Sequence, residues 1–147
     1  MRESGKMLKE GDNVSFIDEI FPDLKGKWII LYFYPKDFTS GCTREAISFR
    51  DKYEKFKEMG VEIIGVSVDD AETHKKFKEK LNLPFNLYSD KSRTLVKKFG
   101  VENMGKARRS TFLINPERNI VSVWGRVNID IHADEIIEKL KEVKKWE

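Results

Sequence analysis

Two runs of almost uninterrupted apolar residues dominate the first half of the chain: WIILYFY at 28–34 and VEIIGVSV at 61–68. Both have the length of a strand and are rich in β-branched and aromatic residues, which favour strands. A strand with apolar residues at nearly every position is covered on both faces, as in a parallel sheet flanked by helices. The pattern therefore predicts two central strands of a parallel sheet.

The segment between these strands repeats apolar residues at helical spacing. Ala46, Phe49, Tyr53 and Phe56 fall on one face of a helix, and charged residues occupy most of the other positions. Gly60 stands where a helix C-cap is expected. We therefore expect one crossover helix to connect the two strands.

The second half of the chain continues the alternation of helices and strands. Asp69 or Asp70 is expected to cap the helix DAETHKKFKEKL. The strand FNLYSD and a short helix, SRTLVKKFG, are expected next, and then the strands STFLIN and IVSVWGRV around the turn PERN, which predicts an antiparallel hairpin. A closing helix places Ile136, Leu140 and Val143 on one face.

This order of elements predicts an α/β protein with a mixed central sheet flanked by helices on both faces. It resembles the element order of the thioredoxin-like fold. We find no internal repeat and no Gly/Ser-rich linker, so we expect residues 1–147 to form a single domain.

Composition argues against several classes of function. The net charge of +3 arises from lysines interleaved with glutamates, which is typical of solvated helix faces, and we expect no nucleic-acid partner. No apolar run approaches the roughly 20 residues that span a bilayer, so no membrane association is expected. One cysteine excludes an intramolecular disulfide, and two scattered histidines form no zinc-binding pattern. We expect a cytoplasmic protein without a bound metal.

The lone cysteine, Cys42, lies in the stretch YPKDFTSGCTREA, at the predicted start of the crossover helix. Unpaired N–H groups and the positive end of the helix dipole favour a thiolate at this position. Thr39 precedes the cysteine by three residues, so that one turn brings its hydroxyl towards the sulfur. Pro35 donates no N–H and can shield the pocket. The grouping predicts a reactive thiol.

Pro35, Thr39 and Cys42 match the P-x-x-x-T-x-x-C motif of peroxiredoxins, and FRDKYEKFKEMGVEIIGVSVDD, LPFNLYSD, FGV and RSTFLI resemble the bacterioferritin-comigratory, or Q-type, branch. The resemblance implies a thiol peroxidase that reduces hydrogen peroxide or alkyl hydroperoxides, with Cys42 as the peroxidatic cysteine. It also implies that Thr39 contacts the peroxide oxygens and that Pro35 screens the sulfenic acid. The arginine that polarises the O–O bond maps onto Arg109, with Arg108 as the alternative. The resemblance requires no metal, haem or flavin.

Two further residues are candidates for supporting roles. Glu45 matches the C-T-x-E pattern of the family and would orient an arginine or the helix start; it is equally well explained as a first-turn carboxylate favoured by the helix dipole. Phe38, inside the motif, is the best candidate for a wall of the pocket, whereas the other aromatic residues nearby are better explained by core packing.

The sequence departs from the branch at Ile47. Many members carry a resolving cysteine there, five residues after the peroxidatic one, so this chain resembles a one-cysteine variant. The sulfenic acid would then be reduced by an external thiol: a thioredoxin-like or glutaredoxin-like protein, a small thiol, or Cys42 of another subunit. The resemblance allows a monomer or a homodimer. The alternative function is a peroxide sensor that forms mixed disulfides with a partner without turnover.

Cys42 fits three further roles less well. A lone cysteine is often a small buried hydrophobe, but the Pro, Thr and Arg matches argue against that here. For a Cys-His hydrolase, neither His74, on a charged helix, nor His132, before the last helix, is suitably placed to act as the base. A phosphatase loop would need an arginine at the position of Ser48.

Overall fold

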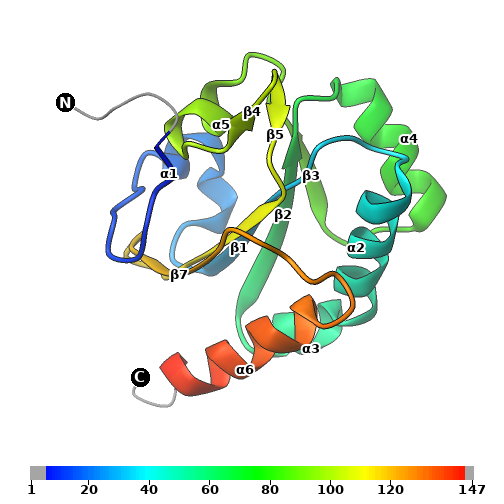
Figure 1. The fold of residues 1–147 in the computed structure, drawn as a ribbon. Coiled ribbons are helices and arrows are strands. Elements are labelled where there is room, and N and C mark those ends of the chain that lie inside the picture. The colour runs from blue at the N-terminus through cyan, green and yellow to red at the C-terminus, as the bar shows by residue number, and fades with distance from the viewer. Residues whose placement is uncertain (1–5, 145–147) are drawn as a thin grey trace.

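The computed structural model describes residues 6–144 and is built around a five-stranded sheet in the order β3-β2-β1-β6-β7 (Figure 1). The ends of the predicted domain, residues 1–5 and 145–147, lie outside the described residues. The strands of this sheet are β1 (Trp28–Phe33), β2 (Val61–Ser67), β3 (Asn86–Ser89), β6 (Ser110–Ile114) and β7 (Ile120–Trp124).

The two apolar runs form the middle of the sheet, as the sequence predicts. β1 pairs in parallel with β2, with Trp28 opposite Val61, and β2 pairs in parallel with β3. β6 then runs antiparallel to β1, and β6 and β7 form the predicted antiparallel hairpin. The sheet is therefore mixed.

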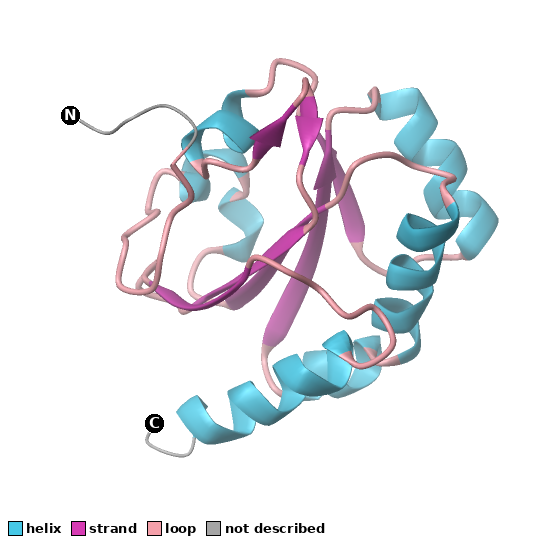
Figure 2. Cartoon of the chain, in the orientation of Figure 1, coloured by secondary structure: helices cyan, strands magenta, loops and turns pink. Residues whose placement is uncertain are grey.

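Helices cover both faces of the sheet (Figure 2). They are α1 (Ile17–Ile20), the 3₁₀ helix η1 (Pro22–Leu24), α2 (Ser40–Asp51), α3 (Tyr53–Glu58), α4 (Ala71–Leu81), α5 (Thr94–Lys98) and α6 (His132–Lys144). Alternate residues of β1 point to opposite faces: Ile30 and Tyr32 join a core with α2, α3, α4 and α6, and Ile29 and Leu31 join a second core with α1 and α5.

The crossover helix departs from the prediction because it is divided at Lys52 into α2 and α3. Lys52 has φ −106° and ψ 4°, and its N–H donates to the Phe49 carbonyl, which tightens the chain locally. The apolar face continues across the break, since both Phe49 and Phe56 are buried. Helical spacing indicates which side chains face the core, but it does not reveal a break that preserves that face.

Two predicted helix ends are confirmed. Asp70 caps α4 by accepting a hydrogen bond from the Thr73 N–H at 2.8 Å. Gly60 follows α3 with φ +75°, a conformation that glycine adopts without steric cost. The hydrophobic pattern did not predict the short ribbon of β4 (Glu102–Asn103) and β5 (Lys106–Ala107), nor α1 and η1.

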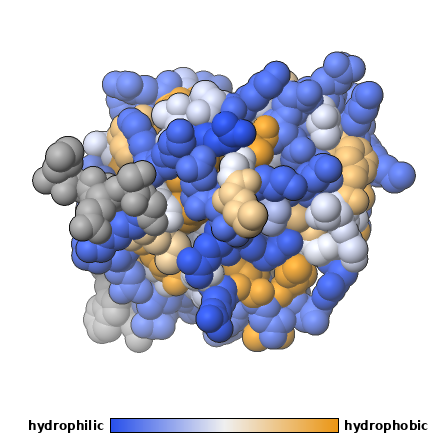
Figure 3. Space-filling view, turned by 45° about the horizontal axis from the view of Figure 1, so that its top comes forward, coloured by the Kyte–Doolittle hydropathy of each residue, from blue (hydrophilic) through white to orange (hydrophobic). Residues whose placement is uncertain are grey.

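The face shown in Figure 3 is mostly hydrophilic, with small separate apolar patches. Among the described residues, the large exposed apolar side chains are Phe38, Met104 and Ile131. None of the described helices has both the length and the apolarity needed to cross a bilayer.

Candidate active site

Cys42 is the third residue of α2, and its side chain is buried, with 2% of its surface exposed. α2 begins at Ser40, because Thr39 is in extended conformation and acts as the N-cap residue. The N–H groups at the start of a helix have no carbonyl partner within the helix, and together with the helix dipole they favour negative charge. The fold thus places the sulfur in the first turn of α2, as the sequence indicates.

Arg109, the residue before β6, reaches Cys42 from a distant part of the chain. Its Nη2 donates a hydrogen bond to Sγ at 3.3 Å. The sheet register explains the encounter: Phe33 at the end of β1 lies opposite Ser110 at the start of β6, so the residue before β6 lies beside the loop that follows β1. Arg108 instead donates to the carbonyl of Gly125 and is exposed, so Arg109 is the arginine that contacts the sulfur.

Glu45 holds the other arm of the same guanidinium. Its Oε1 accepts a hydrogen bond from Arg109 Nη1 at 2.5 Å, and its side chain is buried. Of the two roles expected for Glu45, this contact supports the orientation of an arginine. Burial raises the pKa of Glu45 to about 7, although the charge and the hydrogen bond of Arg109 lower it.

The guanidinium stays charged in this setting. Burial lowers the pKa of Arg109, but the negative charges of Glu45 and Cys42 and the hydrogen bonds to both raise it above its ordinary value. A fixed cation that donates to both a carboxylate and a sulfur can stabilise a thiolate and the charge that develops during its reactions.

Thr39 is exposed, and its hydroxyl donates to the carbonyl of Lys36 at 3.0 Å. It makes no side-chain capping bond to α2. Because the hydroxyl proton is directed to Lys36, the lone pairs of the oxygen are left to accept a hydrogen bond from a ligand. If this hydroxyl contacts a peroxide, as the sequence predicts, Thr39 would therefore accept a hydrogen bond from the peroxide rather than donate one.

Pro35 and Phe38 lie in the same loop, between β1 and α2. Pro35 directly follows the buried Tyr34 and is itself half-buried. Phe38 is 48% exposed, and its ring packs edge-on against Phe77 of α4, with the ring centroids 5.1 Å apart. Phe38 is therefore an aromatic side chain at the surface next to Thr39.

Both histidines are buried, which the charged sequence around His74 did not indicate. His74 Nδ1 lies 2.6 Å from Asp37 Oδ2, and His132 Nε2 lies 2.8 Å from Thr111 Oγ1. Neither contact involves Cys42, which agrees with the argument against a Cys-His hydrolase. Burial lowers the pKa of His132 to about 4.

Sequence reasoning missed one part of this region, the contact of Asp37 with His74 and Asp69. Asp37 follows β1 and Asp69 follows β2, and the carboxyl ends of neighbouring parallel strands meet at one edge of a sheet. That rule, applied to the two predicted strands, would have brought the two aspartates together. It would not have located His74, whose position depends on how α4 packs.

Comparison with known proteins identifies the family of this chain. The AhpC/TSA family model matches residues 9–123. The peroxiredoxin Bcp of Bacillus subtilis is 48% identical over 129 residues, which cover 82% of each chain. The crystal structure of a cysteine-to-serine mutant of PrxQ from Xylella fastidiosa is 32% identical, covers 93% of this chain and 98% of its own, and superposes with a TM-score of 0.85.

A further structure is the bacterioferritin comigratory protein of Xanthomonas campestris, a protein with alkyl peroxide reduction activity. It is 37% identical, covers 82% of each chain and gives a TM-score of 0.77. With Cys42 at the start of α2 and Arg109 against its sulfur, the chain belongs to the AhpC/TSA family, on its peroxiredoxin Bcp/Q branch.

Proposed function

We propose that Cys42 is the peroxidatic cysteine of a thiol peroxidase and that Arg109, Thr39 and Pro35 form its immediate surroundings. The observation that carries the proposal is the guanidinium of Arg109, which donates to Cys42 Sγ at 3.3 Å and is held by Glu45 through its other arm. A buried sulfur that only packed in the core would not need a charged donor fixed in this way.

The first half of the reaction follows from these contacts. The thiolate of Cys42 attacks one oxygen of the peroxide, so that an S–O bond forms as the O–O bond breaks. The sulfur is oxidised to a sulfenic acid, and the peroxide is reduced to water or an alcohol once the leaving oxygen takes up a proton. Arg109 stabilises the charge that develops on the oxygens.

Thr39 has a defined part in this step. Its hydroxyl proton is directed to the Lys36 carbonyl, so its oxygen can accept a hydrogen bond from the O–H of the incoming hydroperoxide and orient it. Pro35 adds no competing N–H donor near the nascent sulfenic acid. Phe38, exposed and next to Thr39, offers an apolar surface suited to the alkyl group of an organic hydroperoxide.

The second half of the reaction requires a thiol from outside the chain, because the sequence contains one cysteine. The incoming thiolate attacks Cys42 Sγ, water leaves and a mixed disulfide forms; a second thiol then releases Cys42. The reductant is a thioredoxin-like or glutaredoxin-like protein, a small thiol, or Cys42 of a second subunit. Because Cys42 is 2% exposed, the first turn of α2 must open before a protein thiol can reach the sulfur.

The proposal extends to the setting of the enzyme. A single domain of residues 1–147 carries the activity, as a monomer or homodimer. The cytoplasm is the proposed location, since a cycle that consumes external thiols depends on a compartment that keeps thiols reduced.

The test is steady-state consumption of hydrogen peroxide and of an alkyl hydroperoxide with each class of reductant. We expect sustained turnover with at least one reductant and none in Cys42→Ser. The alternative function, a sensor without turnover, predicts a single stoichiometric oxidation of Cys42 under every reductant. That result would overturn the proposed peroxidase function.

A further inference from the structure

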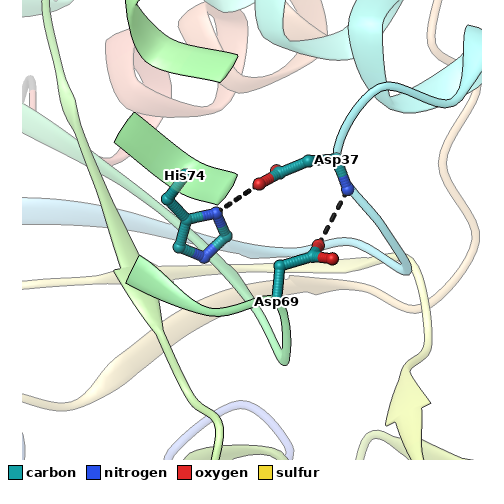
Figure 4. Close-up of side chains that lie close together, drawn as sticks. All are labelled: Asp37, Asp69 and His74. Carbon is teal, nitrogen blue, oxygen red and sulfur yellow. Dashed lines mark hydrogen bonds and ion pairs between the residues drawn. The ribbon is translucent and has the colours of Figure 1, made fainter. Parts of the chain in front are cut away.

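Asp37, in the loop between β1 and α2, forms a buried contact with His74 that the proposed peroxidase reaction does not use (Figure 4). Asp37 lies between Pro35 and Thr39 in the loop that joins β1 to α2, and His74 lies in the first turns of α4. The ring nitrogen Nδ1 is 2.6 Å from Asp37 Oδ2, and both side chains are almost fully excluded from solvent.

The hydrogen bonds around Asp37 and Asp69 fix where the protons are. Tyr34 donates its hydroxyl proton to Asp37 Oδ1 at 2.5 Å. Asp69 Oδ2 accepts two hydrogen bonds, one from the backbone N–H of Asp37 at 2.8 Å and one from the Ser67 hydroxyl at 2.7 Å. The hydroxyl protons of Tyr34 and Ser67 are therefore committed to the two carboxylates.

Among the described residues, each nitrogen of the His74 ring consequently faces only acceptors. Nδ1 faces the Asp37 carboxylate and, at 3.4 Å, the oxygen of Tyr34. Nε2 faces the backbone carbonyl of Tyr88 at 3.1 Å and the oxygen of Ser67 at 3.4 Å. A carbonyl oxygen can only accept a hydrogen bond, so a neutral ring would leave one nitrogen lone pair against an acceptor whichever tautomer it adopted.

We propose that His74 is a buried imidazolium paired with the Asp37 carboxylate, and that this ion pair positions the loop that carries Thr39 into Cys42. The first half of the proposal rests on hydrogen-bond geometry alone. The second half rests on the peroxidase function proposed above. Asp37 and His74 are positioning residues, since neither contacts the sulfur in the structure.

The loop needs such a support because Phe38 has φ +66°, a conformation unfavourable for a residue with a Cβ atom. Asp37, directly before it, is held at its backbone N–H by Asp69 and at its carboxylate by Tyr34 and His74. These contacts hold the chain in the strained turn.

The support reaches Thr39 through the backbone of Lys36. Lys36, next to Asp37, provides the carbonyl that accepts the Thr39 hydroxyl proton at 3.0 Å. A shift of Asp37 moves this carbonyl and turns the hydroxyl away from its accepting orientation. His74 thus acts on the peroxide through Asp37, Lys36 and Thr39, although it lies on a different helix.

A metal ion is the competing explanation of the cluster. One ligand atom from each of Asp37, Asp69 and His74 lies within 4.8 Å of the others. A cation would need an unprotonated ring nitrogen and free carboxylate lone pairs. In this structure Asp37 Oδ2 is engaged by His74, and Asp69 Oδ2 already accepts two protein donors.

The protonation of His74 is tested without any change to the cluster. The chain has two histidines, so the ring ¹⁵N resonances of His74 are assigned by their persistence in His132→Gln. At pH 7 we expect both ring nitrogens of His74 to carry a proton. A neutral tautomer would overturn the ion pair. Stoichiometric binding of added Zn²⁺ that His74→Gln abolishes would also overturn it, in favour of a metal site.

The positioning role is tested by single-turnover oxidation of Cys42 by hydrogen peroxide in Asp37→Asn, His74→Gln and the double variant. We expect each single variant to lose about ten- to a hundredfold in second-order rate, the range for misplaced reacting groups. The double variant should lose no more than the worse single variant, since both changes act through one contact. The thiolate absorbance of Cys42 at pH 7 should stay unchanged.

Asp70→Asn is the matched control. Asp70 caps the same helix α4 by accepting a hydrogen bond from the Thr73 N–H, and asparagine can replace it in that cap, so we expect the wild-type rate.

Thermal unfolding identifies the variants that fold. If Asp37→Asn does not fold, His74→Gln carries the test. Folded variants that oxidise at the wild-type rate would overturn the positioning role. A wild-type protein inert to peroxide would instead refute the peroxidase, with the ¹⁵N result still deciding the ion pair.

Discussion

The guanidinium of Arg109 donates a hydrogen bond to the sulfur of Cys42, although 67 positions separate the two residues in the sequence. The antiparallel pairing of β6 with β1 brings them together, because it places the residue before one strand next to the loop after the other. The two arms of the guanidinium have different partners: Nη1 is held by Glu45, and Nη2 meets the sulfur.

Arg109→Lys keeps the positive charge but loses the planar fork, so lysine cannot contact both Glu45 and Cys42 with the same geometry. We expect the kcat/KM for hydrogen peroxide to fall about 10²- to 10³-fold, the usual cost of losing a donor to developing charge. Stopped-flow oxidation measures this, and Arg108→Lys, next in the chain and exposed, should react like the wild type. The reverse outcome would transfer the role to Arg108.

Glu45→Gln should flatten the pH dependence of stability. Burial raises the pKa of folded Glu45 from its ordinary value of 4.5 to about 7, so between these values the folded chain binds more protons than the unfolded chain. The free energy of unfolding then falls as the pH rises from 4.5 to 7, by about 3 kcal/mol at most. Denaturant titrations from pH 4.5 to 8 give the wild-type minus variant difference, and a constant difference would contradict the assignment.

Gly41→Ala should slow the oxidation of Cys42 without lowering the stability of the protein. A Cβ atom at this position would lie 3.1 Å from Arg109 Nη2, closer than ordinary contact, so the guanidinium must move relative to the sulfur. Alanine in the interior of a helix is more stable than glycine by roughly 0.5–1 kcal/mol, and at the second residue of α2 part of this gain offsets the cost of moving the guanidinium. We expect an unchanged or higher melting temperature and about a tenfold slower oxidation of Cys42. Ser48→Ala, in the same helix, is the control, and a wild-type rate in Gly41→Ala would show that the arginine position is not critical.

Ile47→Cys places a second thiol where the resemblance to the Q-type branch implies a resolving cysteine in many members. Five residues apart in an intact helix, the Cα atoms would lie about 8–9 Å apart, and a disulfide requires less than about 7 Å. We expect peroxide to generate an intramolecular disulfide only as the first turn of α2 unwinds, so mild urea should accelerate it. Mass spectrometry detects the loss of two hydrogens, and Cys42→Ser/Ile47→Cys controls for other oxidation. A rate independent of urea would show that α2 need not unwind.

Local sequence predicted the features that depend on one segment of chain. The apolar runs became β1 and β2 because a strand covered on both faces needs apolar residues at nearly every position. Asp70 caps α4 because its short carboxylate side chain can accept a hydrogen bond from the N–H of Thr73, which has no partner within the helix. The motif residues Pro35, Thr39 and Cys42 are close in sequence, so their grouping around one helix start was predictable in the same way.

Features that depend on how elements pack were not predictable from local pattern. The break at Lys52 leaves the apolar face intact, so the periodicity is the same with one helix or two. His74 is surrounded by charged residues in the sequence, yet α4 packs that position against the ends of β2 and β3, where it is buried.

The sequence by itself determined the fold class and the position of the single cysteine at a helix start, and from that one cysteine it predicted an external reductant. The tertiary structure decided which arginine contacts the sulfur, that Glu45 holds this arginine, and that Asp37 meets His74. The physical reason is that hydrophobic spacing and helix caps act within a few residues, whereas these contacts depend on strand register and helix packing between distant segments.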